Sequence, residues 1–203
     1  MHPAIETLMT EHRLIGQVLG SLETFALSLQ HGAGADRETV KDYAAFFKNF
    51  ADTCHHGKEE DQLFPTMTQF GFPREFGPIA VMLSDHVEGR LHVRALAEIG
   101  EGQGALSPAD RATVISHALA YMPLLRAHIL KEDNILYPMA AQAIPEDRMN
   151  ALSDAFEAFE RDVMGAGQHA AFHALAERLV DEYPPDPASM SAGAACAGCA
   201  GHM

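Results

Sequence analysis

The sequence contains one short motif twice, and both copies place a histidine and a glutamate at metal-ligand spacing. His55 and Glu59 lie in HHGKEEDQLFP, and His128 and Glu132 lie in HILKEDNILYP. In both copies the glutamate lies four residues after the histidine, and a proline lies ten residues after the same histidine. Residues four apart lie on the same face of a helix, so each copy presents an imidazole beside a carboxylate. A core helix does not require this pair, and its repetition in the same frame indicates a chemical role.

A single histidine precedes each copy at almost the same distance. His12 lies 43 residues before His55, and His86 lies 42 residues before His128. The chain therefore has the pattern of two helical hairpins, and an internal repeat of this kind is a strong guide to architecture. Packed face to face, the hairpins would bring six candidate ligands together: His12, His55, Glu59, His86, His128 and Glu132.

This donor set predicts a pair of metal ions in the centre of the bundle. Buried imidazoles and carboxylates are costly without partners, and cations would supply them. If both glutamates bridge, each metal has two imidazoles and two carboxylate oxygens, and an oxo, hydroxo or water bridge adds a fifth ligand. Structural zinc is closed and tetrahedral, and magnesium and calcium prefer oxygen. The set therefore favours two iron ions over manganese, with a position open for O2, NO or peroxide.

The segments that carry these residues are predicted to be long helices. Apolar residues recur at helical spacing, whereas glycine and proline gather in a few places. We expect helices at 3–30, about 37–69, about 78–99 and about 108–143, followed by helical pieces at 148–163 and 168–182. Ser107 is the expected N-cap of the fourth helix, and Pro123 is expected to kink or break it. The predicted fold class is all-α: an antiparallel up-down four-helix bundle with an additional C-terminal helix.

The domain prediction is one bundle with its C-terminal helix over residues 1–182. Residues 183–203 are rich in proline, glycine and alanine and poor in large apolar side chains, which predicts a flexible, disordered tail.

The composition excludes several classes of partner. The chain has 203 residues, is 47% apolar and 21% charged, and carries a formal net charge of -14. Nucleic acids and anionic membranes attract clustered lysine and arginine, so we expect neither as a partner. The N-terminus lacks a signal-peptide pattern, and no apolar run is long enough to span a membrane. Three cysteines do not form a disulfide framework, and the expected location is the cytoplasm.

The ordered pattern His, His-x-x-x-Glu, His, His-x-x-x-Glu, with Leu-Phe-Pro after the first glutamate, resembles the hemerythrin-like, HHE cation-binding proteins. The resemblance covers most of residues 1–180. It implies a four-helix bundle that holds a non-heme di-iron centre. It further implies that Glu59 and Glu132 bridge the metals and that four histidines are terminal ligands: His12, His55, His86 and His128.

The sequence departs from the oxygen-carrying hemerythrins at one position. Those proteins have a second histidine four residues after the third-helix histidine, and this chain has Arg90 there. One iron is therefore expected to lose an imidazole, which favours a more open and reactive, or sensing, centre over reversible oxygen carriage. Tyr121, two turns before His128, is a weaker candidate for a place near the metals.

The residues beside the six candidate ligands are expected to have secondary roles. His56, Glu60 and Asp133 are predicted to face solvent or to contact the ligands from outside. Glu11 and Asp85 each precede a candidate histidine, and adjacent helix positions do not face each other. Each is therefore expected to contact a different ligand, if any.

Other histidines and cysteines form weaker patterns. His169 and His173 are four apart without a matching carboxylate and are predicted to be structural or surface residues. Cys54 is expected to be an inert thiol. The C-terminal CAGCAGH, with Cys196, Cys199 and His202, is interpreted as incidental, with a labile metal or redox role as the alternative.

The predicted function is a non-heme di-iron protein that binds or reacts with O2, NO or peroxide in sensing, storage or detoxification. The sequence leaves two alternatives open, which are an iron donor for iron–sulfur cluster repair and a peroxide- or NO-metabolising oxidoreductase. It does not decide whether the protein is an enzyme, and it identifies no redox partner. A metal-free scaffold is the remaining hypothesis.

Overall fold

The computed structural model describes residues 2–165 and 167–187. Every regular element in these two ranges is helical, as the fold-class prediction required. Residues 188–203, which hold most of the predicted tail and the CAGCAGH motif, lie outside the described residues.

The helices begin and end close to the predicted positions, but several contain π-helical turns, labelled η. In chain order the elements are α1 Pro3–Gln30, α2 Arg37–Phe46, η1 Phe47–His56, η2 Glu59–Leu63, α3 Phe64–Gln69, α4 Pro78–Gly100, α5 Pro108–Lys131, η3 Glu132–Leu136, α6 Tyr137–Ala143, α7 Glu146–Phe159, η4 Glu160–Met164 and α8 Gln168–Glu182.

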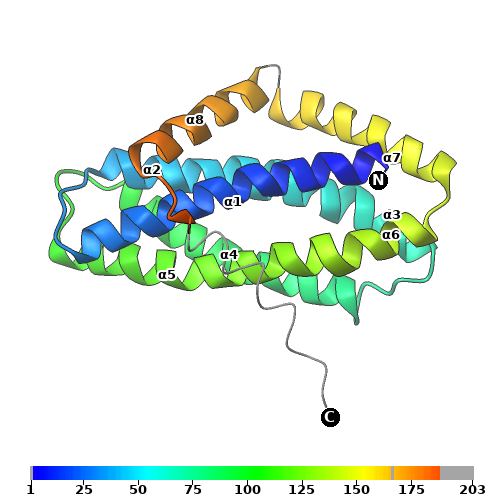
Figure 1. Ribbon diagram of the computed structural model, residues 1–203, viewed down its shortest axis with the longest axis horizontal. Coiled ribbons are helices and arrows are strands. Elements are labelled where there is room, and N and C mark those ends of the chain that lie inside the picture. The colour runs from blue at the N-terminus through cyan, green and yellow to red at the C-terminus, as the bar shows by residue number, and fades with distance from the viewer. Residues whose placement is uncertain (1, 166, 188–203) are drawn as a thin grey trace, which may run out of the picture.

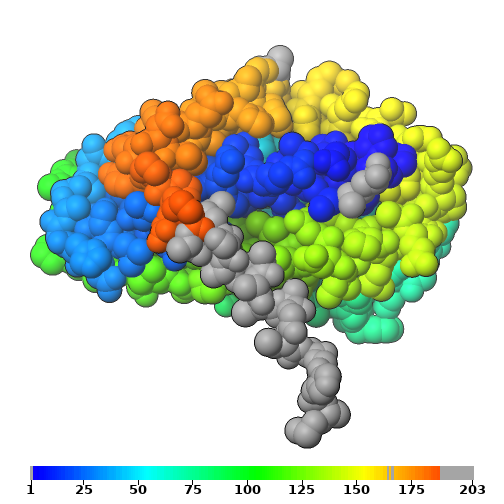
Figure 2. Space-filling view, in the orientation of Figure 1, coloured from blue at the N-terminus to red at the C-terminus, as the bar shows by residue number. Residues whose placement is uncertain are grey.

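Four long segments lie side by side (Figure 1). Each contacts two others, so that α1, the α2–η1 segment, α4 and α5 follow one another around a closed ring. The last two helices, α7 and α8, lie along the outside of α1, and α8 also contacts α2. Figure 2 shows them along one edge of the molecule, beside α1, which is visible on the same face. The four segments thus surround a common interior, and the C-terminal helices close one side of it.

The start of α5 follows the capping chemistry of its sequence. The Ser107 hydroxyl accepts a hydrogen bond from the Asp110 amide, and the Asp110 carboxylate accepts one from the Ser107 amide, which satisfies two helix-end donors at once. Pro123 was predicted to kink or break this helix, and the break is ruled out, since α5 continues as one α-helix from Pro108 to Lys131.

The repeated motifs coincide with π-helical turns. The segment η2 begins at Glu59 and η3 begins at Glu132, and each ends just before a helix with proline in its first turn, Pro65 or Pro138. A proline inside a helix lacks the amide donor and crowds the carbonyl four residues earlier. A wider turn relieves this crowding, and single π turns occur often at functional sites.

The apolar core is divided into two clusters. One cluster contains Ile15, Phe50 and Leu125 and lies towards one end of the bundle. The other contains Leu8, Leu63 and Leu136 and lies towards the opposite end. In every long segment the candidate histidine falls between residues of the two clusters, so the polar side chains form a layer with apolar packing on both sides.

Candidate metal centre

The structure brings the six predicted site residues into this middle layer. Each is at most 3% exposed, and both glutamates are fully buried. Their potential ligand atoms fall into two groups whose members lie within 4.8 Å of one another. One group consists of His12, His55 and Glu132, and the other consists of His56, Glu59, His86 and His128. Each group thus combines imidazoles with one of the two repeated glutamates.

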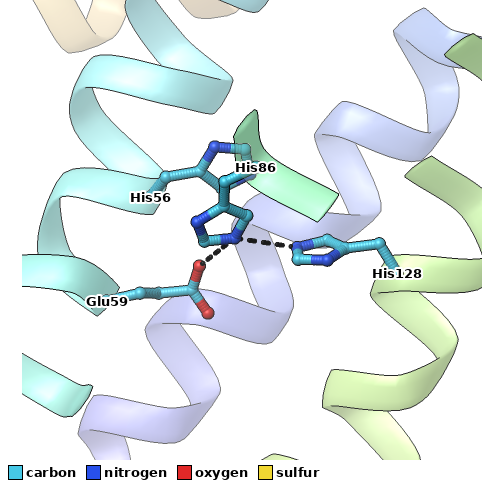
Figure 3. A group of neighbouring side chains, drawn as sticks. All are labelled: His56, Glu59, His86 and His128. Carbon is cyan, nitrogen blue, oxygen red and sulfur yellow. Dashed lines mark hydrogen bonds and ion pairs between the residues drawn. The ribbon is translucent and has the colours of Figure 1, made fainter. Parts of the chain in front are cut away.

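Figure 3 shows the second group. Its side chains point towards one another from three segments of the bundle. The Nε2 atom of His86 lies 3.1 Å from Nε2 of His128 and 3.5 Å from Oε2 of Glu59. Two ring nitrogens and a carboxylate oxygen therefore face a common centre.

The outer nitrogen of each imidazole is held by a carboxylate. The Nδ1 atom of His12 lies 2.7 Å from Asp133, and that of His86 lies 2.7 Å from Glu60. The remaining three pairs join His55 to Glu11 at 2.8 Å, His128 to Asp85 at 3.3 Å and His56 to Asp52 at 3.3 Å. A ring that donates its Nδ1 proton outward to such a carboxylate can offer Nε2 as an inward-facing metal ligand.

These outer partners follow the internal repeat. Glu11 and Asp85 each precede a first-helix histidine and bind the histidine of the second helix in the same hairpin. The acids that follow the repeated glutamates, Glu60 and Asp133, instead bind a histidine of the other hairpin. The predicted outside contacts of Glu60 and Asp133 are confirmed, and Glu11 and Asp85 contact a ligand other than their neighbour, as expected.

Two lysines at equivalent positions complete this outer layer. Lys58 precedes Glu59 and binds both Glu11 and Glu160, whereas Lys131 precedes Glu132 and binds Asp85. Lys58 is fully buried, so its carboxylate partners compensate a charge that would otherwise be costly. The lysines fix the carboxylates that in turn orient His55 and His128.

Four of the inward-facing atoms have no hydrogen-bond partner. Among the described residues, five buried side-chain polar atoms lack one, and four of these belong to the centre: Nε2 of His55, Oε2 of Glu59, and both oxygens of Glu132. Buried polar groups in proteins are nearly always paired. The donor set that faces inward therefore fits metal cations, which would pair with these nitrogen and oxygen atoms together.

Burial and mutual repulsion separate the ionisation of the two glutamates. Burial, followed by the charge of the nearby Glu132 carboxylate, raises the pKa of Glu59 well above its usual range. Burial acts in the same direction on Glu132, but the positive charges of His128 and His12 lower its pKa well below that range. Desolvation opposes protonation of His12, yet the hydrogen bond to Asp133 and the negative charge of Glu132 raise its pKa to about 9. Two carboxylates this close require positive charge, which protons supply here and metal ions can replace.

The alternative prediction that His56 would face solvent is wrong. Its ring is only 5% exposed and stacks on the His86 ring, with 3.8 Å between centroids. The π-helical η1 segment ends at His56, and its smaller rotation per residue brings adjacent side chains closer to one face. Arg90, which stands where oxygen carriers have a histidine, binds Asp52 and Glu60 from outside. The half of the site expected to lack an imidazole therefore has His56 within the ligand group.

The tyrosine near the centre is Tyr137 rather than Tyr121. The Tyr137 hydroxyl donates a hydrogen bond of 2.8 Å to Oε1 of Glu59 and lies 3.4 Å from Nε2 of His12. Tyr137 precedes the proline of the second motif, and the first motif has Phe64 there. Aligning the two motifs residue by residue would have indicated Tyr137, because it is the position where one motif has a tyrosine and the other a phenylalanine. Tyr121 is buried one layer away, against Phe47 and Gly89.

The remaining predicted positions lie outside this centre. Cys54 is buried, and desolvation raises the pKa of its thiol to about 12, which fits an inert role. His169 and His173 are half-buried on α8 with 4.7 Å between ring centroids. The His169 ring lies close to Glu11 and Glu160, but the Lys58 ammonium already binds both carboxylates.

Comparisons with known proteins agree with this arrangement. A family model described as "Hemerythrin HHE cation binding domain" matches residues 3–140. One uncharacterized protein of Mycobacterium bovis and two of Mycobacterium tuberculosis strains are each 21% identical over 178 residues, which cover 88% of this chain and 68% of each relative. No solved structure gives a significant match. In the described part of the chain, no helix is long and apolar enough to cross a membrane. The matched region contains all of the repeated histidines and glutamates, and the chain belongs to the hemerythrin HHE cation-binding family.

Proposed function

We propose that the protein is a non-heme di-iron protein in an antiparallel four-helix bundle, whose centre binds or reacts with O2, NO or peroxide. The observation that carries the proposal is the set of unpaired inward atoms on Glu59, Glu132 and His55. They lie among imidazoles whose outer nitrogens are all occupied. Such a set is a preformed ligand shell rather than a hydrogen-bonded polar core.

We assign one iron ion to each of the two groups of candidate ligands. His12 and His55 would hold one iron ion, and three imidazoles would hold the other: His56, His86 and His128. Glu59 and Glu132 lie in different groups, but Glu132 is close enough for its charge to raise the pKa of Glu59, which supports a bridging role for both. Bound iron would supply a change of oxidation state and a coordination position for a small ligand.

The surrounding residues would control the ligand's environment. The Tyr137 hydroxyl donates to Glu59 and would hold one carboxylate oxygen in a fixed direction. The apolar clusters above and below the polar layer would limit the access of water. The group with His56 would offer three imidazoles to its iron, and the group with His55 would offer two.

Metal analysis and optical spectra test this proposal. Iron-loaded protein should contain two irons per chain, and its visible spectrum should change on aeration and again with NO. Glu59→Ala and Glu132→Ala should each abolish the spectrum, whereas Glu88→Ala, an exposed acid on α4, should not. A fully helical protein that binds no iron would refute the di-iron function. Consumption of hydrogen peroxide over many turnovers would assign an enzymatic role, and a spectral change without turnover would assign binding.

A further inference from the structure

A cavity of about 320 Å³ lies directly against the centre, between η1 and α4. Its wall includes His56, Gly89 and Tyr121. His56 also belongs to the group formed with Glu59, His86 and His128. The cavity therefore reaches from the surface to the outer side of a proposed ligand.

The charge of this cavity is opposite to that of the whole molecule. The chain carries a formal net charge of -14, yet the lining contains Lys48, Arg90 and Arg94 against the single carboxylate of Asp52. Arg90 is already bound to Asp52 and Glu60. Lys48 and Arg94 are exposed, and neither has an ion-pair partner among the described residues. The mouth thus carries two uncompensated positive charges on an acidic surface.

The inner wall offers an unused hydrogen-bond donor. Tyr121 is 2% exposed, and in the described structure its hydroxyl has no hydrogen-bond partner. Burial, with a contribution from the Asp52 charge, raises its pKa far above the usual range, so the phenol keeps its proton. Gly89 leaves room beside it, because a Cβ atom there would lie 3.2 Å from the Tyr121 ring. A hydroxyl donor on the wall of a cavity with a cationic mouth is suited to an anion.

We propose that this cavity admits and docks small monovalent inorganic anions on their way to the metal centre. The inference rests on the di-iron function proposed above and adds to its ligands an anionic class, such as the superoxide anion or nitrite. Lys48 and Arg94 attract the anion against the repulsion of the whole chain, and Tyr121 receives it inside. A positively lined cleft raises the association rate of an anion by focusing the field.

Stopped-flow association of azide and nitrite with the ferric, iron-loaded protein tests the proposal. In Lys48→Gln/Arg94→Gln, the association rate constant at low ionic strength should fall about tenfold. The rate constants of the variant and the unmodified protein should become equal at about 1 M salt, where the screening length is only a few ångströms. The matched control is Arg74→Gln/Arg161→Gln, which makes the same change in net charge at two exposed arginines away from the cavity and should leave the rate constant near that of the unmodified protein.

A neutral ligand separates this inference from the function on which it rests. Association of NO with the ferrous protein should be unchanged in the Lys48/Arg94 variant, since NO carries no charge. Tyr121→Phe, which removes only the hydroxyl, should weaken azide affinity severalfold and leave NO affinity unchanged. If the protein binds no iron or NO, the proposed function fails. If NO binds normally and azide associates equally fast with the Lys48/Arg94 variant and the arginine control, the anion route is overturned while the di-iron function stands.

Discussion

The five imidazoles of the centre each depend on a partner that is not itself a proposed ligand. A carboxylate on Nδ1 fixes the tautomer, so that Nε2 faces inward with its lone pair available. The same contact orients the ring and makes it a better donor to a metal. Metal affinity should therefore depend on pairs of residues, and each pair can be tested through its outer member.

Asp133→Asn is the first such test. Asp133 lies 2.7 Å from Nδ1 of His12, and the amide would keep the shape but remove the charge that holds this ring. Loss of an outer partner commonly weakens metal affinity by about 10- to 100-fold. Iron affinity measured by competition with a chelator should fall within that range. Asp61→Asn, an exposed acid near the first motif, is the control, and an equal loss in both variants would contradict the assigned role of Asp133.

His56→Ala tests the residue that sequence reasoning placed outside the ligand set. Its loss should leave the Glu59 group with His86 and His128 only, and iron content after dialysis should fall from two per chain towards one. The exposed His31→Ala should retain both irons. Full retention of iron by His56→Ala would show that this ring only packs against His86.

The sequence predicted most of the centre because helical spacing and the internal repeat constrain where side chains point. The six repeated residues needed only i, i+4 geometry to be placed together. His56 was missed because adjacent residues on an α-helix point in different directions, and the π-helical turn of η1 is not encoded in a simple periodic pattern. Tyr137 was not predicted, because helical spacing relates residues within one segment, whereas the Tyr137 phenol contacts Glu59 of another segment across the bundle.

Helix positions were equally predictable, and their irregular turns were not. Apolar periodicity and the glycine- and proline-containing links located all of the long segments to within a few residues. The π turns η2 and η3 depend on how each segment accommodates a proline while its glutamate stays in the polar layer. The contacts with neighbouring helices decide whether a π turn forms, so a local sequence pattern does not predict it.

The junction between the second segment and α7 should be sensitive to a single methyl group. Gly57 lies between η1 and η2, and a Cβ atom there would come within 2.6 Å of the Phe159 ring. Gly57→Ala should therefore push α7 away from the bundle and destabilise the fold by about 1–3 kcal/mol, the usual cost of overpacking. Gly16→Ala in α1 has nothing within 4 Å of the new atom and should stabilise by about 0.5–1 kcal/mol. Urea unfolding measures the free energy of unfolding of both variants. Equal values would mean that α7 moves to accommodate the added methyl group without a cost in stability.

The molecule as a whole combines an apolar bundle with a charged central layer, and this combination should make its stability depend on metal. Without cations, the buried oxygens of Glu59 and Glu132 rely on protons and on imidazoles at 3.1–3.8 Å. With cations they gain direct partners, and a ligand that binds only the folded state stabilises it by mass action. Free iron at 100 times its dissociation constant would contribute about 2.7 kcal/mol.

For a chain of this length, that free energy corresponds to a rise in melting temperature of about 5–11 °C, since each kcal/mol shifts it by about 2–4 °C. Anaerobic thermal unfolding with and without ferrous iron, followed by circular dichroism, measures the shift. Glu59→Gln/Glu132→Gln removes both carboxylate charges but keeps their volume, so its melting temperature should not respond to iron. If the melting temperature of this variant still rises with iron, the stabilising metal binds elsewhere in the molecule and the proposed centre at Glu59 and Glu132 is wrong.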